Sequence, residues 1–202
     1  MRKIVFPGTE IDRSINTEYS YTEFNKKYIS VLSMYDSETN TIIPLEGFWH
    51  PNLGEKVVGV VVDYDRSKIY VELSSFVQGV IELPKHFDNP IKIDKGELVE
   101  ATVSAIQSKV EVSLLFNKIL DSDGIVIRMP VVKMPRVIGK NNTMISQIIE
   151  YTKSNIIVGM NGVIWLKGGN ADLALKAFEE INKNAHIHGL TNKIKEMLTS
   201  SK

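Results

Sequence analysis

The sequence predicts a multidomain α+β protein in which an all-β segment and a five-stranded β-barrel precede a C-terminal domain of mixed helices and strands. Short strand-like runs separated by turn residues fill the first 115 residues, whereas helical periodicity begins after Val132. The 202 residues suffice for two or three small domains, and the hydrophobic content of 43% is typical of a globular protein. We expect three domains, at residues 1–52, 53–118 and 119–202.

The N-terminal segment carries three alternating apolar runs bounded by turn residues, which predict strands. These runs are Lys3–Phe6, Lys27–Ser33 and Thr41–Pro44. A unit of this size made of strands alone buries little surface. We therefore expect it to pack on the next domain or to dock on partner subunits.

The second segment contains five strand-like runs, at Lys56–Asp63, Lys68–Ser74, Val77–Leu83, Leu98–Ile106 and Val110–Leu115. Five short strands with a long connection between the third and the fourth predict a small Greek-key barrel of the OB type. We expect residues 116–123 to form a polar junction into the third domain.

Barrels of the OB type commonly bind single-stranded nucleic acid through aromatic stacking and basic loops. The aromatic candidates are Tyr64, Tyr70, Phe76 and Phe87, and the cationic candidates are Arg66 and Lys68. Each aromatic residue is also explained by packing at the ends of the barrel. We select Tyr64, Arg66 and Lys68 as RNA-binding candidates.

In the third segment, residues 132–151 predict two short helices joined by a glycine turn. Pro135 suits a first helical turn, and the isoleucines that follow the turn recur at helical spacing. The turn reads Gly139-Lys140-Asn141-Asn142. Its backbone N–H groups, its lysine and the positive end of the following helix dipole together favour an anion such as phosphate.

Predicted strands at residues 124–130, 155–159 and 162–167, and a helix starting near Asn170, surround this turn. The order of strand, helix, helix, strand, strand, helix resembles a type I KH domain, whose GXXG loop clamps the backbone of about four nucleotides. Asn142 stands where the second glycine is expected. Because asparagine tolerates left-handed backbone angles, we expect the loop shape to be kept and phosphate approach to be weakened. The RNA-binding candidates here are Lys133, Arg136, Gly139, Lys140, Asn141 and Asn142; packing or helix capping is an equal explanation of Arg136.

Residues 159–162, with the sequence Gly-Met-Asn-Gly, form a second notable turn. The Asn161-Gly162 pair is typical of a hairpin connection, which explains the motif without a ligand. Two further roles for Asn161 stay open: it contacts RNA, or it fastens the barrel to the KH domain.

Charge and composition favour a binding protein over an enzyme. The net charge of the chain is zero, but residues 123–202 hold 11 Lys and Arg against 6 Asp and Glu, whereas residues 1–122 hold 13 Lys and Arg against 18 Asp and Glu.

The chain has no cysteine, which excludes disulfides and thiolate metal sites. Its N-terminal apolar run is too short for a signal peptide. We therefore expect a cytoplasmic protein. Asp63 with Asp65, and His186 with His188, are weak metal candidates, because ordinary turn chemistry explains the aspartates better and contacts with helix-end carbonyls explain the histidines better. We expect no cofactor, no metal and no membrane partner.

The domain order resembles the RNA-binding cap subunits of the archaeal exosome, of the ribosomal RNA-processing protein four type. The resemblance rests on residues 5–8, 47–54, 135–140 and 159–162, together with Trp165. It implies a non-catalytic subunit present in three copies on a hexameric ring of RNase PH-like subunits. It also implies that the subunit feeds RNA 3′ ends to phosphorolytic sites in the ring, and it allows a second type of cap subunit on the same ring. The alternatives are a standalone RNA-binding regulator of translation or transcription, and an enzyme built on Asp63, Asp65 and a histidine.

Overall fold

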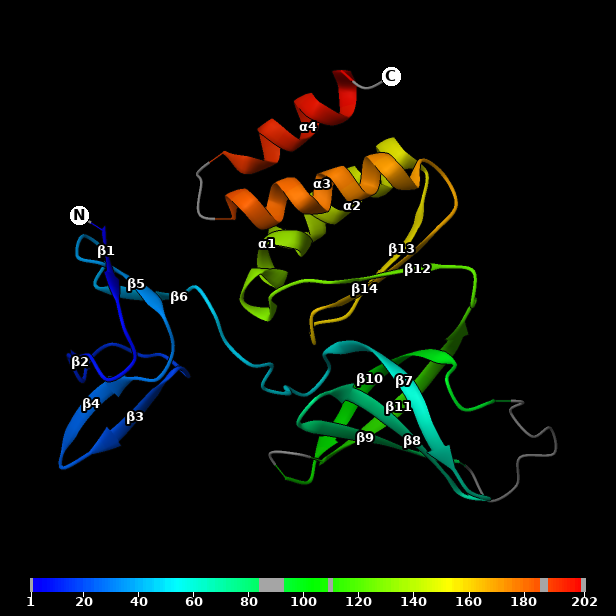
Figure 1. Cartoon of the computed structure of the whole chain (residues 1–202), viewed down its shortest axis with the longest axis horizontal. Helices are drawn as coiled ribbons and strands as arrows, with labels where there is room; N and C mark the ends of the chain where they lie inside the picture. The colour runs from blue at the N-terminus through cyan, green and yellow to red at the C-terminus, as the bar shows by residue number, and fades with distance from the viewer. Residues whose placement is uncertain (1, 84–92, 109–110, 186–188, 201–202) are drawn as a thin grey trace. The chain divides into compact units, whose positions relative to one another are not determined.

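The structure is a computed structural model that describes residues 2–83, 93–108, 111–185 and 189–200 (Figure 1). The chain packs as two compact units, one of residues 1–48 with 130–132 and one of residues 49–129 with 133–202. The first unit is all-β. The second contains both the barrel and the C-terminal α+β domain, so the expected multidomain α+β fold class is confirmed.

The first unit consists of two three-stranded antiparallel sheets, ordered β1-β5-β6 and β2-β4-β3. Their strands are β1 Arg2–Val5, β2 Glu10–Ile11, β3 Ser20–Glu23, β4 Lys26–Ile29, β5 Ser33–Asp36 and β6 Thr41–Pro44. Of the described residues in this unit, Val5, Ile15 and Ile29 are the buried apolar side chains. Such a small core agrees with the expectation that strands alone bury little surface.

One predicted strand of this unit is wrong in its extent. The run predicted at Lys27–Ser33 is divided, because the chain bends at Val31 and passes from β4 in one sheet to β5 in the other. The strands β2 and β3 were not predicted. Their residues are mostly polar and exposed, so hydrophobic alternation gives no signal for them.

The second unit begins with a closed five-stranded barrel of the predicted OB type. Its strands are β7 Lys56–Tyr64, β8 Lys68–Ser74, β9 Val77–Glu82, β10 Leu98–Ile106 and β11 Glu111–Leu120. The order around the barrel is β10-β11-β9-β8-β7, with β10 pairing back to β7 and β11 running parallel to β9. Alternate side chains such as Ile69 and Val71 fill the interior.

The polar junction predicted at residues 116–123 is corrected by the structure. Strand β11 continues to Leu120, which pairs with Leu98 and is 4% exposed. The prediction was misled by two consecutive polar residues, Asn117 and Lys118, which both lie on the paired strand: Asn117 is hydrogen-bonded to Thr102 on β10, and Lys118 pairs with Glu100. Val110, the first residue of the predicted strand, and residues 84–92 of the predicted long connection lie outside the described residues.

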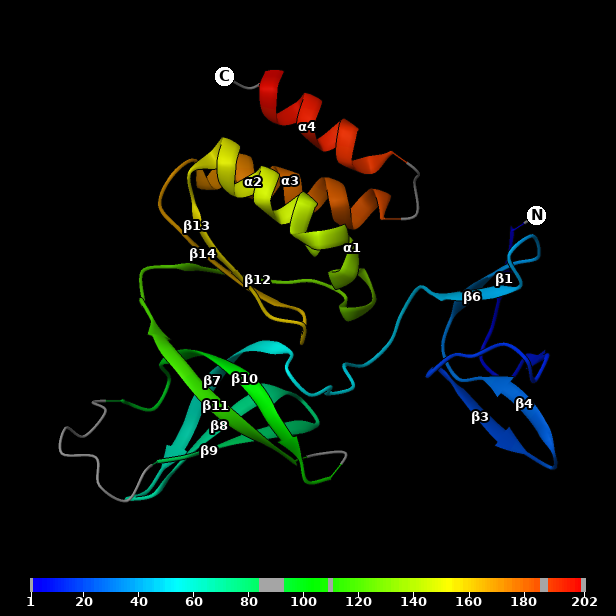
Figure 2. The ribbon, with the colours of Figure 1, turned by 180° about the vertical axis from the view of Figure 1, so that it is seen from behind.

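The C-terminal domain has the predicted order βααββα. Its elements are β12 Ile125–Arg128, the 3₁₀ turn η1 Val131–Lys133, α1 Met134–Ile138, the 3₁₀ turn η2 Lys140–Asn142, α2 Thr143–Thr152, β13 Asn155–Val158, β14 Val163–Lys167 and α3 Ala171–Asn184. The sheet order is β12-β14-β13, and the helices lie together on one face of this sheet (Figure 2). Asn170 caps α3 as predicted, accepting a hydrogen bond from the backbone N–H of Leu173 at 3.1 Å.

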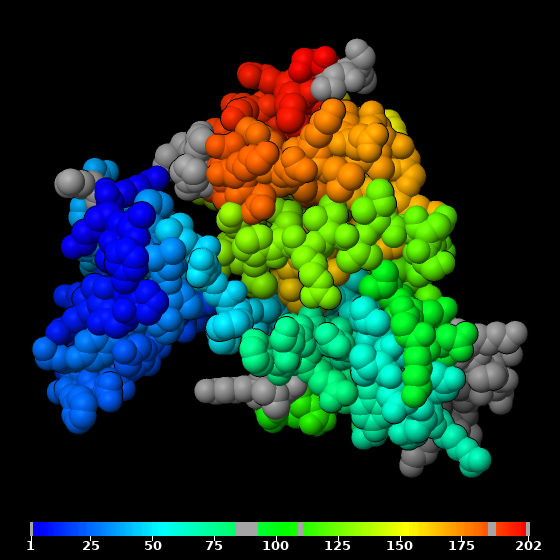
Figure 3. All heavy atoms as spheres, viewed as in Figure 1, coloured from blue at the N-terminus to red at the C-terminus, as the bar shows by residue number. Residues whose placement is uncertain are grey.

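A further helix, α4 Leu190–Ser200, follows the βααββα set. Leu190, Ile194 and Leu198 are buried and join the same apolar core as α2 and α3. In the space-filling view α4, in red, forms a continuous surface with α3, in orange (Figure 3). The helix therefore extends the apolar core of this domain by packing against α2 and α3.

Candidate nucleic-acid interface

The predicted phosphate loop lies between α1 and α2. Gly139 follows α1 with φ 75° and ψ 169°, outside the range that other residues adopt readily. A Cβ atom at this position would lie 2.7 Å from the backbone nitrogen of Met144 in α2. A side chain would therefore collide with the first turn of α2, which explains why the loop begins with glycine.

Lys140, Asn141 and Asn142 form the exposed part of the loop. Asn141 has φ 52° and ψ 38°, and Asn142 has φ 63° and ψ 15°, so both are left-handed and the loop shape expected for an asparagine in the second glycine position is present. No side chain caps the N-terminus of α2. An exposed lysine thus stands three residues before the start of α2, an arrangement that suits a phosphate near the helix N-terminus. Phosphate binding itself stays a prediction.

Two further cationic candidates flank this loop in different environments. Arg136 is exposed in the last turn of α1. Lys133 is partly buried, and its Nζ donates to the backbone oxygen and to Oδ1 of Asn182, both at 2.8 Å. Two of the three ammonium hydrogens of Lys133 are thereby used to hold the segment before α1 against α3, so Arg136 is the more available of the two.

Asn161 is buried at the junction between the barrel and the sheet of the C-terminal domain, with 6% of its surface exposed. Its Nδ2 donates to the backbone oxygens of Val58 and Leu73, both at 2.8 Å, and its Oδ1 accepts from the N–H of Val58 at 3.2 Å. Both amide hydrogens are used. Of the two roles left open for Asn161, the structure shows the fastening role, and an RNA contact would require this junction to open.

The glycines on either side of Asn161 are explained by the same junction. A Cβ atom on Gly159 would lie 2.7 Å from the backbone nitrogen of Val58, so only glycine allows this approach of the turn to β7. Met160 donates from its N–H to the oxygen of Lys56 at 2.8 Å, and Gly162, with φ 83°, closes the hairpin. Sequence reasoning found the turn but could not identify its partner strand.

The β7–β8 turn of the barrel carries the other RNA-binding candidates. Asp65 organises this turn, because its Oδ1 accepts from the N–H groups of Ser67 at 2.7 Å and Lys68 at 2.9 Å. These hydrogen bonds, led by those from Ser67, hold the pKa of Asp65 below its usual value. Tyr64 is 45% exposed at the end of β7, and Arg66 is exposed at the tip.

Carboxylates balance the cations around this turn. Lys68 Nζ lies 3.7 Å from Glu82 Oε1, and Lys95 Nζ lies 2.7 Å from Asp63 Oδ1. The Lys95 ammonium lowers the pKa of Asp63, and the pKa of Lys95 is raised in return. The turn therefore offers Arg66 and the Tyr64 ring to a ligand within a nearly neutral surface.

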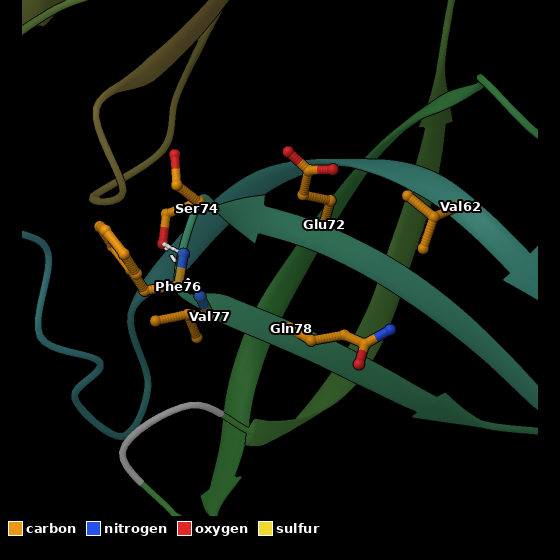
Figure 4. A pocket seen from close by; sticks show the side chains of 7 residues that line it. Val62, Glu72, Ser74, Phe76, Val77 and Gln78 are labelled. Carbon is orange, nitrogen blue, oxygen red and sulfur yellow. Dashed lines mark hydrogen bonds between the residues drawn. The ribbon is translucent and has the colours of Figure 1, made fainter.

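A hollow of about 440 Å³ lies on the barrel beside the β8–β9 turn (Figure 4). Its lining residues are Val62, Glu72, Ser74, Ser75, Phe76, Val77 and Gln78. Ser74 Oγ accepts from the N–H of Val77 at 3.2 Å and fixes the turn, and Phe76, at one end of the hollow, is 63% exposed. Phe76 is thus exposed and not packed into the barrel interior, whereas Phe87 lies outside the described residues.

The structure does not gather all candidates into one cluster. Asn161 binds Val58 near the start of β7, and Tyr64 ends this strand six residues later, which corresponds to about 20 Å of extended chain. The candidates form separate groups: the α1–α2 loop with its flanking cations, the barrel turn, and the buried junction.

Alternatives based on metal chemistry find no support in the described part of the chain. No group of three or more His, Asp or Glu side chains that could hold a metal ion occurs among these residues. Asp63 and Asp65 are occupied by Lys95 and by the β7–β8 turn. His186 and His188 lie outside the described residues. No helix in the described part is long and apolar enough to span a membrane.

Comparison with known proteins places this geometry in a family. Residues 124–172 match the family model of a KH domain. The exosome complex component Rrp4 of Pyrococcus furiosus is 33% identical over 98% of this chain and 83% of its own length. The chain belongs to the Rrp4 family of exosome components.

Other relatives agree with this assignment. The exosome complex component Rrp4 of Picrophilus torridus is 32% identical to this Rrp4-family chain over its whole length and 94% of the relative. A crystal structure described as an exosome complex RNA-binding protein superimposes with a TM-score of 0.63 over 76% of this chain and 97% of that chain, at 23% identity. The solved structure shows that the fold is shared.

Proposed function

We propose that this chain is a non-catalytic, RNA-binding cap component of a cytoplasmic exosome. In this proposal three copies sit on a hexameric ring of RNase PH-like subunits and guide RNA 3′ ends into the ring, where phosphorolysis degrades or processes them. A second type of cap subunit can share the same ring. Membership of the Rrp4 family supports the assembly, since the relatives are named as components of the exosome complex.

The observation that carries the RNA-binding part is the exposed α1–α2 loop. It combines an uncapped helix N-terminus, Lys140 and the nearby Arg136 in the half of the chain that carries more cations than anions. Backbone donors and lysine or arginine side chains bind phosphates without reading bases. This suits a subunit that must pass RNA of many sequences.

The experiment that tests this loop uses the charge-reversal double variant Arg136→Glu with Lys140→Glu. Its affinity for single-stranded RNA is measured at several salt concentrations. We expect weaker binding and a flatter salt dependence, with the slope reduced by about 0.7 for each phosphate that the variant no longer neutralises. The control is Lys176→Glu with Lys195→Glu, which changes the net charge equally on exposed positions of α3 and α4. Equal affinity of wild type and loop variant, or equal losses in both variants, would contradict the loop assignment.

The same samples report on catalysis. Incubated with phosphate and Mg²⁺, the pure chain is expected to leave the RNA at full length, because the proposed phosphorolytic sites belong to the ring. Phosphate-dependent shortening of the RNA by the pure chain would refute the non-catalytic role. Native mass of the protein taken from its host separates the cap, in a complex of several hundred kilodaltons by our expectation, from a free regulator.

A further inference from the structure

The tip of the β3–β4 hairpin in the first unit has an unusual backbone. Glu23 pairs with Lys26, so Phe24 and Asn25 alone form the loop. Their φ angles are 45° and 63°, which makes this a two-residue turn of type I′. Such turns favour asparagine, aspartate or glycine at both positions, and a bulky residue with positive φ is an outlier.

The side chain of Phe24 gains nothing from the fold to offset this backbone cost. It is 90% exposed, more than any other large apolar side chain in the described part of the chain. A strained residue that buries no surface stabilises neither the hairpin nor the core, and strain of this kind is concentrated at functional positions. We propose that Phe24 is a docking anchor that inserts into an apolar pocket of a protein partner.

The hairpin below Phe24 is built rigidly enough to present it. The rings of Tyr21 and Tyr28 stack across the two strands with centroids 5.5 Å apart. Lys26 pairs with Glu10 of β2 at 2.8 Å, and Lys27 Nζ donates to the backbone oxygen of Ile15 at 2.6 Å. An anchor held by strands on both sides loses little freedom on binding, which favours affinity.

Charge decides what kind of partner the anchor fits. Residues 1–48 contain 5 Lys and Arg against 7 Asp and Glu. The two lysines of the hairpin are engaged within the unit by Glu10 and by the backbone of Ile15. A surface of this sign repels a polyanion, so the ring of Phe24 is suited to an apolar protein pocket rather than to an RNA base. Resting on the proposed function, the partner is an RNase PH-like ring subunit.

The test uses the full chain and the reconstituted ring subunits of the same organism. Phe24→Asn places a residue that type I′ turns favour at the strained position. We expect the melting temperature of the isolated chain to rise by about 2–4 °C, and the affinity for the ring to fall by about tenfold or more. Phe24→Trp, which keeps an aromatic anchor, should retain ring binding. Leu115→Ala, which removes a 63% exposed apolar side chain from the barrel, should leave it unchanged.

The outcomes separate this inference from the function on which it rests. If the wild-type chain does not bind the ring, the proposed cap function fails and the partner with it. If the wild type binds and Phe24→Asn binds equally well, the anchor is overturned while the cap function stands. A loss of RNA affinity in the isolated Phe24→Asn chain would overturn the choice of a protein partner. A fall in its melting temperature would overturn the argument from backbone strain.

Discussion

Two asparagines in glycine-containing turns show how differently the same residue type is used in this chain. Asn161 is buried, and all its amide hydrogens are bonded to the barrel backbone. Asn142 is exposed, left-handed and makes no capping hydrogen bond to α2. The first is therefore a structural fastener, and the second is an exposed position in the loop that we predict to bind phosphate.

Substitutions at Asn142 should separate stability from RNA binding. In Asn142→Asp a carboxylate stands at the N-terminus of α2, where it favours the helix, so stability should be kept or raised by about 0.5 kcal/mol. The same charge repels phosphate, and a repulsion of about 1 kcal/mol would weaken RNA binding about fivefold. Asn142→Gly, which restores the two-glycine loop, should tighten binding. Urea unfolding and RNA titration measure the two effects.

The matched control is Asn40→Asp, since Asn40 is also exposed and left-handed, with φ 51°, but lies in the first unit. It should leave RNA affinity unchanged. If both aspartate variants lose affinity equally, the effect is one of net charge and the α1–α2 loop is not the binding site.

For single residues, the sequence predicted the backbone conformation correctly where that conformation depends on neighbouring residues in the chain. Gly139, Asn142 and Asn170 have the conformations expected of them because turn and cap geometry depends on neighbouring residues. It left Asn161 undecided between RNA and the barrel, because its partner Val58 is 103 residues away in the chain. It selected Lys133 for its charge, whereas the bonds of Lys133 to Asn182 depend on tertiary packing.

At the scale of elements, strands were predicted well where alternation marks a buried face. The bounds of β8 and β10 agree with the prediction because their apolar residues alternate regularly toward the barrel interior. β2 and β3 escaped prediction because both faces of that small sheet carry polar residues. The end of β11 was missed because the consecutive polar residues Asn117 and Lys118 break the alternation, at the point where a bulge interrupts its pairing with β10.

The helices of the KH domain were the easiest elements to predict. Their apolar stripes, with Gly139 before α2 and Asn170 before α3, indicate both position and buried face. The β3–β4 hairpin is the opposite case, because Phe24 in a type I′ turn contradicts the turn chemistry that sequence rules rely on. Local rules fail most often at positions kept for function, which is consistent with the role proposed for Phe24.

At the scale of the whole chain, the barrel and the KH domain share one compact unit, which the sequence indicated only through the fastening role left open for Asn161. An apolar cluster joins them, formed by Val58 and Leu120 on the barrel side and by Ile157, Val163 and Trp165 on the other. Asn161 adds three hydrogen bonds to the same junction. We therefore expect the two domains to unfold together.

Asn161→Ala tests this coupling. The substitution leaves the N–H of Val58 and the oxygens of Val58 and Leu73 without their partner, so we expect a loss of about 3 kcal/mol of unfolding free energy. It should also separate the melting of the barrel from that of the KH domain in calorimetry. Trp165, 2% exposed at the junction, gives the fluorescence signal for the urea titration.

Asn117→Ala, which removes an exposed asparagine hydrogen-bonded to Thr102, is the control and should change stability by less than about 0.5 kcal/mol. Equal losses in the two variants, or a single unchanged transition in Asn161→Ala, would show that the apolar cluster alone couples the domains.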